Sequence, residues 1–485
     1  MDAQLQDLDG RTADVVVVGG GLAGLAAAAT AARADATMSV VLLDVQGGGG
    51  HAATDEVGRY KFNRGAHALY KGGPAQRVLK ELGVRISGAN PPLKGARARL
   101  GDHTGSLPLG AMTLARTNLL GGGDKVRLGK LLAGLGRIKP AKLSGITIAD
   151  WLDDRGLEGT ARQFTEMLVR LTTYSNDPGV ISADVVLAQL QAALSSGVEY
   201  LHNGWGTMVS GLTTVARDHG VRIATGARVT AVVPDGRSVR VELGEDVLQA
   251  RRVIIAAGSP QAAAALLPGI DRTTVTATSG SADATAAGDG AGGLEGNSAA
   301  SSHPRATPNG MPVEWQRLGP PTRTACLDLG LRETPEVQLM LGIDQPIYMI
   351  CHAPAAAGLA PRGGATVQFV RYLSAAEDPS ADASRAAFAE HAAIAGIDVD
   401  RAEESRYLHR MPACTAQPTP AGGGLRGRPA VDSTGVDNVL VAGDWVGPEG
   451  YLADASLASG AAAGRAAVEG LAAAPTVHAA GGTAG

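Results

Sequence analysis

Three glycines and one carboxylate near the N-terminus have the types and the spacing that bind a dinucleotide. Gly19, Gly21 and Gly24 form a Gly-x-Gly-x-x-Gly motif. In a strand–turn–helix unit the first glycine permits a tight turn, the second lets the backbone approach a pyrophosphate, and the third lets the helix pack closely on the strand. Asp44 follows Gly24 by twenty residues, where a carboxylate would bind a ribose hydroxyl. This spacing favours an adenine dinucleotide without a 2′-phosphate.

The segment from 14 to 44 supplies the elements that must position these residues. It reads as a strand, DVVVV, then a glycine turn, a helix, LAAAATAARA, and a second strand, SVVLLD. Continuous β-branched runs are typical of strands buried on both faces of a parallel sheet. The motif alone would be weak in a chain with 67 glycines, but inside a βαβ unit it becomes much stronger. Leu22 and Ala23 then lie at the helix N-terminus, where backbone amides face the phosphates.

A second glycine run, residues 47–50, follows the acid and precedes His51. A nicotinamide-binding unit has no need of such a loop. The stretch GGGGHAAT resembles the GGRxxT-like element of the flavoprotein superfamily that contains amine oxidases, phytoene desaturases and protoporphyrinogen oxidases. In this resemblance Gly49, Gly50 and His51 occupy the GGR positions. Two departures stand out: His51 lacks the permanent charge of the usual arginine, and Asp44 is shorter than the usual glutamate.

Three more segments carry the same resemblance, in the right order. FNRGAHALYKGG, residues 62–73, is similar to the segment that passes beside the isoalloxazine ring. ARVTAV resembles the strand whose backbone meets adenine, which implies Val229 as a contact. NVLVAGDWVGPEGYLADASLASG resembles the closing motif, which implies that Gly443 and Asp444 contact the ribityl–pyrophosphate region. The helix starting near Leu452 would point its N-terminus at the flavin and stabilise the anionic reduced ring.

RGAHALYKGGPA and AGDWVGPEGYLADAS look most like bacterial phytoene-dehydrogenase-like oxidoreductases. The resemblance implies an α/β fold in which a Rossmann-type, discontinuous FAD-binding domain accompanies a discontinuous α+β substrate domain. The poor apolar content of one further stretch predicts a disordered insertion. The expected boundaries are 1–100, 205–270 and 430–475 for the FAD-binding domain, 101–204 and 311–429 for the substrate domain, and 274–310 for the insertion.

Other elements follow from local patterns. Residues 100–200 are mostly helical in pattern, with Thr147 and Ser182 expected to cap two helices. CLDLGL, YMICHA and ATVQFVRYL read as strands, and residues 381–396 as a helix.

The composition is that of an ordinary globular protein. The chain has 485 residues and a formal net charge of −4, which excludes a nucleic-acid binder with a strong cationic field. Cys326, Cys351 and Cys414 lack the spacing of a disulfide framework or a zinc site, and a reducing cytoplasm fits best. The N-terminal residues do not have the pattern of a secretory signal, and no apolar run is long enough to span a bilayer.

A basic stretch between 116 and 142 leaves two interpretations open. Seven cations and one acid accompany a leucine face in this stretch. Most such runs are solvated helix faces. A basic amphipathic helix can also lie on the inner face of an anionic membrane, which would suit an enzyme that extracts a lipid.

Candidates for chemistry are few, because a flavin carries the redox reaction itself. His67 lies in the segment expected beside the ring and could relay a proton, although a turn histidine bonded to backbone explains it equally well. Cys414 could carry a thioether to the flavin, but its surroundings do not match the attachment motif of relatives that do so. His409, Arg410 and Met411 are expected either to line the cavity or to form a helix end or loop.

The leading interpretation is an FAD-dependent oxidoreductase that moves hydride between flavin N5 and an unsaturated, apolar substrate of the isoprenoid or carotenoid kind. Flavin-dependent amine oxidation is a second hypothesis, against which the 3% share of aromatic residues weighs slightly. A third is a non-catalytic binding protein, because Rab GDP dissociation inhibitors share the fold and bind no flavin. The sequence does not identify the electron acceptor.

Overall fold

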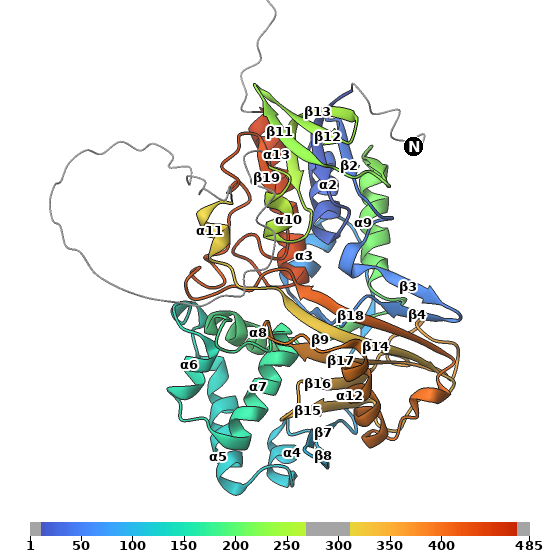
Figure 1. Cartoon of the computed structure of the whole chain (residues 1–485), viewed down its shortest axis with the longest axis vertical. Helices are drawn as coiled ribbons and strands as arrows, with labels where there is room; N and C mark the ends of the chain where they lie inside the picture. Colours follow the sequence, from blue (N-terminus) through green and yellow to red (C-terminus); the bar gives the residue numbers. More distant parts are fainter. Residues whose placement is uncertain (1–10, 268–310, 473–485) are drawn as a thin grey trace, which may run out of the picture.

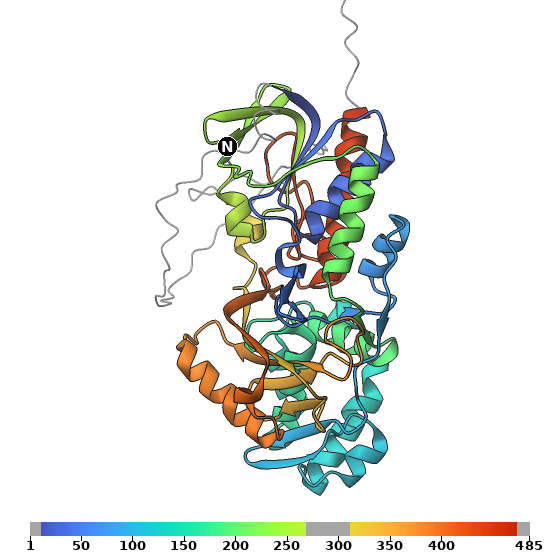
Figure 2. The same ribbon diagram turned by 90° about the vertical axis from the view of Figure 1, so that its right-hand side faces the viewer.

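The computed structural model describes residues 11–267 and 311–472, which form two sheets surrounded by helices. In Figure 1 the sheet that contains β13 lies at the top and the sheet that contains β14 lies below it. The turned view in Figure 2 shows the same two parts stacked along the long axis of the molecule.

The first sheet contains both the N-terminal and the last strand of the described chain. Its order is β10-β2-β1-β13-β12-β11, and β19 also pairs with β13. All pairings among β10, β2, β1, β13 and β19 are parallel, whereas β11 and β12 form an antiparallel extension. The strands are β1 (Thr12–Val18), β2 (Val40–Leu43), β10 (Arg222–Ala224), β11 (Ala231–Asp235), β12 (Ser238–Leu243), β13 (Asp246–Ile255) and β19 (Val439–Val441).

Three helices cover this sheet and pack on one another: α2 (Leu22–Ala34), α9 (Gly206–Asp218) and α13 (Ala453–Ala472). Helix α2 is rich in alanine, and its first eleven residues are buried. Gly460 and Gly464 of α13 lie directly over the backbone of Ala23 and Ala27. A Cβ at either glycine would overlap a carbonyl oxygen of α2, so these small residues set the close spacing of the two helices.

The second sheet has the order β18-β14-β17-β16-β15-β7-β8. Because β7 pairs with β15, the last residues of the segment 1–100, which was expected to belong to the FAD-binding domain, are part of this second sheet. The strands are β7 (Arg97–Leu100), β8 (His103–Ser106), β14 (Thr322–Leu331), β15 (Leu339–Gly342), β16 (Ile347–Cys351), β17 (Ala365–Leu373) and β18 (Glu404–Cys414).

Helix α12 (Ala381–Ile394) packs on one face of the second sheet, where Phe388 meets Phe369. The other face meets a helical layer that shares one apolar core with it: α4 (Ala111–Arg116), α5 (Gly122–Gly134), α6 (Ile148–Asp153), α7 (Gly159–Thr173) and α8 (Ala183–Ser195). The remaining strands and α-helices of the described fold are short: β3 (Thr54–Val57), β4 (Tyr60–Asn63), β5 (Leu69–Tyr70), α3 (Pro74–Glu81), β6 (Gly88–Ala89), β9 (Val198–Leu201), α10 (Pro260–Ala264) and α11 (Val313–Gln316).

The two predicted helix caps differ in outcome. Thr147 accepts a hydrogen bond from the Asp150 amide at 3.1 Å, and the Asp150 carboxylate accepts one from the Thr147 amide, so this cap is confirmed. Ser182 directly precedes α8, but its hydroxyl donates to Asp184 and to the carbonyl of Ser144. The hydroxyl caps no amide of the helix, and that part of the prediction is wrong.

Other local expectations meet the structure in different ways. The expected helix 381–396 is α12, two residues shorter at its C-terminal end. The predicted insertion 274–310 lies outside the described residues. Leu128 and Leu135 of the basic stretch are buried, while Arg116, Lys130 and most other cations there are exposed. Among the described helices, none has the length and the apolar character to cross a membrane.

Candidate cofactor site

A cavity of about 670 Å³ lies at the carboxyl ends of the parallel strands of the first sheet. Its volume falls within the range of roughly 300–1,000 Å³ that is usual for ligand and cofactor sites. Val18, Leu43, Ala256 and Gly443 bring the ends of four strands to its wall. The residues predicted at the site that line it are Gly19, Gly21, Leu22, Ala23, Asp44, Gly49, Gly50, His51, His67, Val229, Gly443, Asp444 and Leu452.

Gly24 is the predicted cofactor residue that does not line the cavity. It lies beneath the turn, where a Cβ would overlap the carbonyl oxygen of Gly19. Gly19 itself has a φ of +111°, a conformation that L side chains rarely adopt. Gly21, in contrast, has no atom within 4 Å of the place of a Cβ, so its backbone faces open space in the cavity. Gly24 therefore allows close packing beneath the turn, whereas Gly21 leaves room for a ligand.

Asp44 binds the glycine turn through its carboxylate. Its carboxylate accepts hydrogen bonds from the amides of Gly20 at 2.6 Å and Gln46 at 2.7 Å. The backbone carbonyl of Asp44 also accepts from the Ala227 amide, which brings the segment of Val229 to the same end of the cavity. That segment was expected to be a strand, but β11 begins only at Ala231, and Val229 lies in the extended connection before it.

The second glycine run folds back onto the first. The Gly49 amide donates to the Gly20 carbonyl at 2.7 Å, which joins the two loops. Gly48, Gly49 and Gly50 all have positive φ, at +89°, +88° and +51°. Gly48, to which the sequence assigned no role, is therefore required by backbone conformation, and only Gly47 takes an ordinary one.

The C-terminal motif lines the cavity where the chain leaves β19. The Asp444 carboxylate accepts hydrogen bonds from the amide and the hydroxyl of Thr415, which ties the first sheet to the end of β18. Helix α13 begins directly after Leu452, whose φ is +56°. In its first turn Asp454 accepts from the Ala75 amide at 2.8 Å, and burial raises the pKa of this carboxyl group to about 6.

His67 is held by neighbours on two sides. Its Nε2 lies 2.8 Å from the carbonyl oxygen of His51 and donates to it, and its ring stacks on Trp205 with centroids 4.3 Å apart. Burial lowers the pKa of His67 to about 4, so the imidazole is neutral at pH 7. These contacts fix the loop of His51 against the wall. The catalytic role of His67 stays a prediction, and the ring would have to exchange protons through Nδ1.

We expect the free energy of unfolding to decrease as the pH falls from about 6.5 to 4. Burial lowers the pKa of His67, His352 and His391 from 6.5 to about 4. The unfolded chain binds these protons first, so acid favours unfolding, by roughly a few kcal/mol in total. Asp454, whose pKa is raised in the folded protein, binds its proton before the unfolded chain does and so offsets part of this loss of stability below pH 6.

Urea unfolding at pH 7, 5.5 and 4.5 measures the change in the free energy of unfolding with pH. His352→Phe should flatten it, and an unchanged slope in this variant would contradict the assignment.

The residues around Cys414 belong to an edge strand, not to the helix end or loop that was one expectation. β18 runs through His409 and Arg410, whose side chains are exposed, and Met411, which lines the cavity. Ala413 and Thr415, on either side of Cys414, also line the cavity. Cys414 itself is fully buried, and its thiol donates to the Ala416 carbonyl at 3.2 Å. The thiol therefore lies in the core, which disfavours a thioether link to a cofactor.

A cluster of aromatic rings beside the cavity was not predicted. It contains six of the eight tyrosines: Tyr70, Tyr174, Tyr200, Tyr348, Tyr372 and Tyr451. Tyr70, Tyr174 and Tyr451 line the cavity, and Tyr372 lies behind them, with its ring 6.1 Å from that of Tyr174. Burial raises the pKa of these phenols, so they are neutral. Overall aromatic content gave no sign of the cluster, because its members come from distant segments.

Comparisons with known proteins agree with this architecture. The family of NAD(P)-binding Rossmann-like domains matches residues 17–82. A search of curated proteins found no match. Solved structures match almost the whole chain, among them an oxidoreductase from Methanosarcina mazei, at 16% identity and a TM-score of 0.62 over 92% of this chain and 98% of that one.

Two amine oxidases are similar in the same way. Cyclohexylamine oxidase from Brevibacterium oxydans IH-35A is 16% identical, with a TM-score of 0.62, and putrescine oxidase bound to putrescine is 15% identical, with a TM-score of 0.66. Each match covers 95% of this chain and 99% of the other. At this identity the likeness concerns the fold alone. The chain therefore has the mixed α/β fold of FAD-dependent oxidoreductases, built on a Rossmann-like dinucleotide-binding domain.

Proposed function

We propose that this protein is an FAD-dependent oxidoreductase that transfers hydride between flavin N5 and an unsaturated, apolar substrate. One observation carries the proposal: the glycine turn, the acid after β2 and the Gly443–Asp444 motif, from distant parts of the sequence, face one cavity. When bound, FAD would supply the hydride chemistry, and the protein would supply binding and orientation.

The residues around the cavity fit FAD. The open space at Gly21 and the amides at the start of α2 suit a pyrophosphate. Asp44 suits a ribose hydroxyl, and Val229, which also lines the cavity, suits a backbone contact with adenine. The start of α13 also lines the cavity, where its partial positive charge would favour negative charge on a reduced flavin.

The charges of the cavity favour a neutral substrate. Among the described residues that line it, the carboxylates are Asp44, Asp444 and Asp454, and each already accepts a hydrogen bond from a backbone amide. Neutral tyrosines and apolar groups such as Leu69 also line the cavity. A substrate with a double bond next to a C–H group fits the tyrosine and apolar walls better than a cation does, because these groups carry no negative charge to pair with it.

Anaerobic reduction of the flavin tests the substrate class. The FAD-loaded protein is mixed without oxygen with an isoprenoid polyene, and separately with putrescine and cyclohexylamine. We expect the polyene to bleach the oxidised flavin and the amines to leave it unchanged. Bleaching by an amine would overturn this choice of substrate. Oxygen, a quinone and a nicotinamide nucleotide, added to the reduced protein in turn, then identify the electron acceptor.

Amine oxidation remains the second candidate because of the tyrosine cluster. Aromatic faces attract cations through their ring quadrupoles, and the three tyrosines of the cluster that line the cavity could frame an amine. The low overall aromatic content, which weighed against this hypothesis, does not apply to the cavity itself. A non-catalytic role of the Rab GDP dissociation inhibitor kind is the third candidate, and failure to bind FAD would support it.

Asp44→Ala is expected to weaken FAD binding by about 1.5–3 kcal/mol, the range for a lost hydrogen bond to a charged group. Dilution of the FAD-loaded protein, followed by the fluorescence of released flavin, measures the change. Asp218→Ala is the matched control, because this exposed aspartate at the end of α9 lies away from the cavity. Equal affinity of Asp44→Ala and wild type would remove Asp44 from the site.

A further inference from the structure

Arg64 occupies a position that the sequence motif does not reveal. It directly follows β4 and lines the cavity. Its amide donates to the carbonyl of Ala53 at 3.0 Å, which joins it to the loop of the second glycine run. Its Nη1 lies 3.5 Å from Oε1 of Gln46, the residue whose amide binds Asp44. Arg64 therefore contacts the segment of the second glycine run on both sides, at Gln46 before it and at Ala53 after it.

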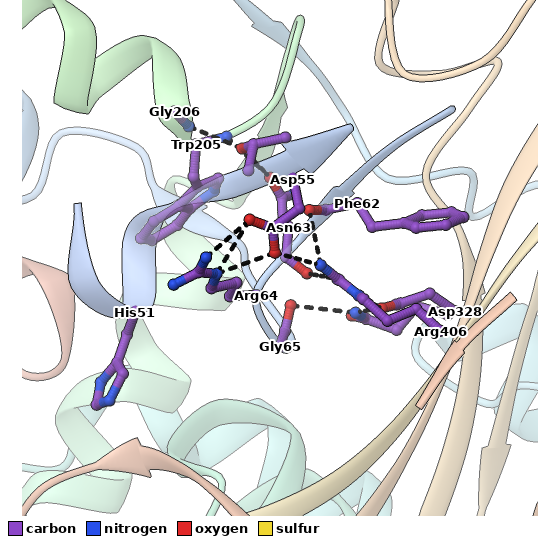
Figure 3. Close-up of polar contacts among 12 residues, drawn as sticks. His51, Asp55, Phe62, Asn63, Arg64, Gly65, Trp205, Gly206, Asp328 and Arg406 are labelled. Carbon is purple, nitrogen blue, oxygen red and sulfur yellow. Dashed lines mark hydrogen bonds and ion pairs between the residues drawn. The ribbon is translucent and has the colours of Figure 1, made fainter. Parts of the chain in front are cut away.

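The guanidinium group of Arg64 is held from behind by a carboxylate (Figure 3). Asp55 accepts from its Nε at 2.9 Å and from its Nη2 at 2.9 Å, a two-pronged pairing that fixes the plane of the group. Nearby arginines lower the pKa of Asp55, so this carboxyl group stays ionised. Nε and Nη2 are thus used for positioning, while among the described residues Nη1 has only its long contact with Gln46.

A second ion pair shares the same carboxylate. Arg406 donates to Asp55 at 2.7 Å and to Asp328 at 2.9 Å and 2.6 Å, so the four charges alternate from the second sheet to the cavity (Figure 3). Arg406 shares its charge between Asp328 and Asp55, so the two carboxylates and two guanidinium groups form a neutral series. Arg64 is the cationic end of this series and the member that lines the cavity.

A pyrophosphate is stabilised by a permanent positive charge beside it. The residue at position 51 does not provide this charge. His51 is exposed and has no permanent charge, and its carbonyl is taken up by His67. Arg228 is the other arginine among the described lining residues, but it is exposed and lies beside Val229, at the end expected for adenine. Among these lining residues, Arg64 is therefore the permanent cation that remains to pair with a pyrophosphate, which is expected at Gly21 and the start of α2.

We propose that Arg64 supplies the permanent cation that binds the pyrophosphate of the cofactor, in place of the arginine that is absent at position 51. This inference rests on the proposed function, since it takes FAD as the ligand. The role is one of binding, and it assigns Arg64 no part in hydride transfer.

Exchange of the two positions tests the proposal in the full-length protein. We expect Arg64→Gln to weaken FAD binding by about 10- to 100-fold, as for the loss of a charge-assisted hydrogen bond. Arg64→Lys should lose less, because it keeps the charge without the fork. His51→Arg should restore most of the lost affinity in the Arg64→Gln protein, yet change wild-type affinity by less than about threefold, because the pyrophosphate already has its cation.

Release of FAD on dilution measures all variants, with Arg116→Gln as the control, an exposed arginine on α4 outside the cavity. Melting temperatures show whether each variant is folded, and Arg64→Lys serves if Arg64→Gln is not. A wild-type protein that binds no FAD refutes the proposed function itself. Wild-type binding with undiminished affinity in Arg64→Gln, or a larger loss in Arg228→Gln, overturns only the role of Arg64.

Discussion

Gly24→Ala should both destabilise the protein and prevent FAD binding, whereas Gly21→Ala should prevent binding alone. A methyl group on Gly24 would overlap the Gly19 carbonyl, so the turn and α2 would have to separate. Overpacking of this kind costs about 1–3 kcal/mol or more. A methyl group on Gly21 meets no protein atom within 4 Å and would occupy the space through which a pyrophosphate approaches.

The comparison needs two measurements for each variant: the melting temperature without added FAD, and the affinity for FAD. We expect a lower melting temperature only for Gly24→Ala, and an affinity reduced at least about 100-fold for both, since a displaced pyrophosphate would lose several charge-assisted hydrogen bonds. Gly226→Ala is unsuitable as a control because its φ is positive, but Gly145, with no atom near its Cβ position and an ordinary φ, can be replaced by alanine. Full FAD affinity in Gly21→Ala would place the ligand elsewhere.

Arg406→Gln should lower the free energy of unfolding by about 3–5 kcal/mol, the usual cost of leaving a buried charge unpaired. Asp328 is 1% exposed, and Arg406 is its charged partner in the described structure. Burial already raises the pKa of Asp328, and loss of the arginine would raise it further. Gln368, which donates to Asp328 at 2.6 Å and to the Gly65 carbonyl at 3.1 Å, would not replace the charge.

Urea unfolding of Arg406→Gln, Asp328→Asn and the double variant separates the charge effect from general damage. Because Asp328→Asn removes the buried charge, the double variant should be more stable than Arg406→Gln alone. Additive losses would contradict a specific pairing. Arg410→Gln is a matched control on the same strand, since Arg410 is exposed and pairs with an exposed aspartate, Asp378.

The sequence could predict what depends on neighbouring residues. The βαβ unit, the spacing of Gly19, Gly21 and Gly24, and the Thr147 cap are local patterns, and each occurs in the structure. Strand β18 was missed because it is an edge strand that, among the described strands, pairs only with β14. Its charged residues and Pro412 are tolerated at an edge, where one side of the strand needs no hydrogen-bonding partner.

Contacts between distant residues could not be predicted in the same way. Arg406 is separated from Asp55 by 351 positions, and nothing in the local sequence of either residue indicates the other. The tyrosine cluster likewise gathers residues from 70 to 451. These contacts arise because the second sheet packs against the loops of the first part, and they determine which groups face the cavity beyond the motif.

Identification of the nucleotide that the full-length protein holds tests the central claim most directly. The purified protein, incubated with FAD and freed of excess, is denatured, and the supernatant is analysed by mass and by its visible spectrum. We predict one FAD per chain, all of it released, because the buried thiol of Cys414 does not face the cavity. A colourless protein after incubation with FAD, or one that retains only a nicotinamide nucleotide, would contradict the account.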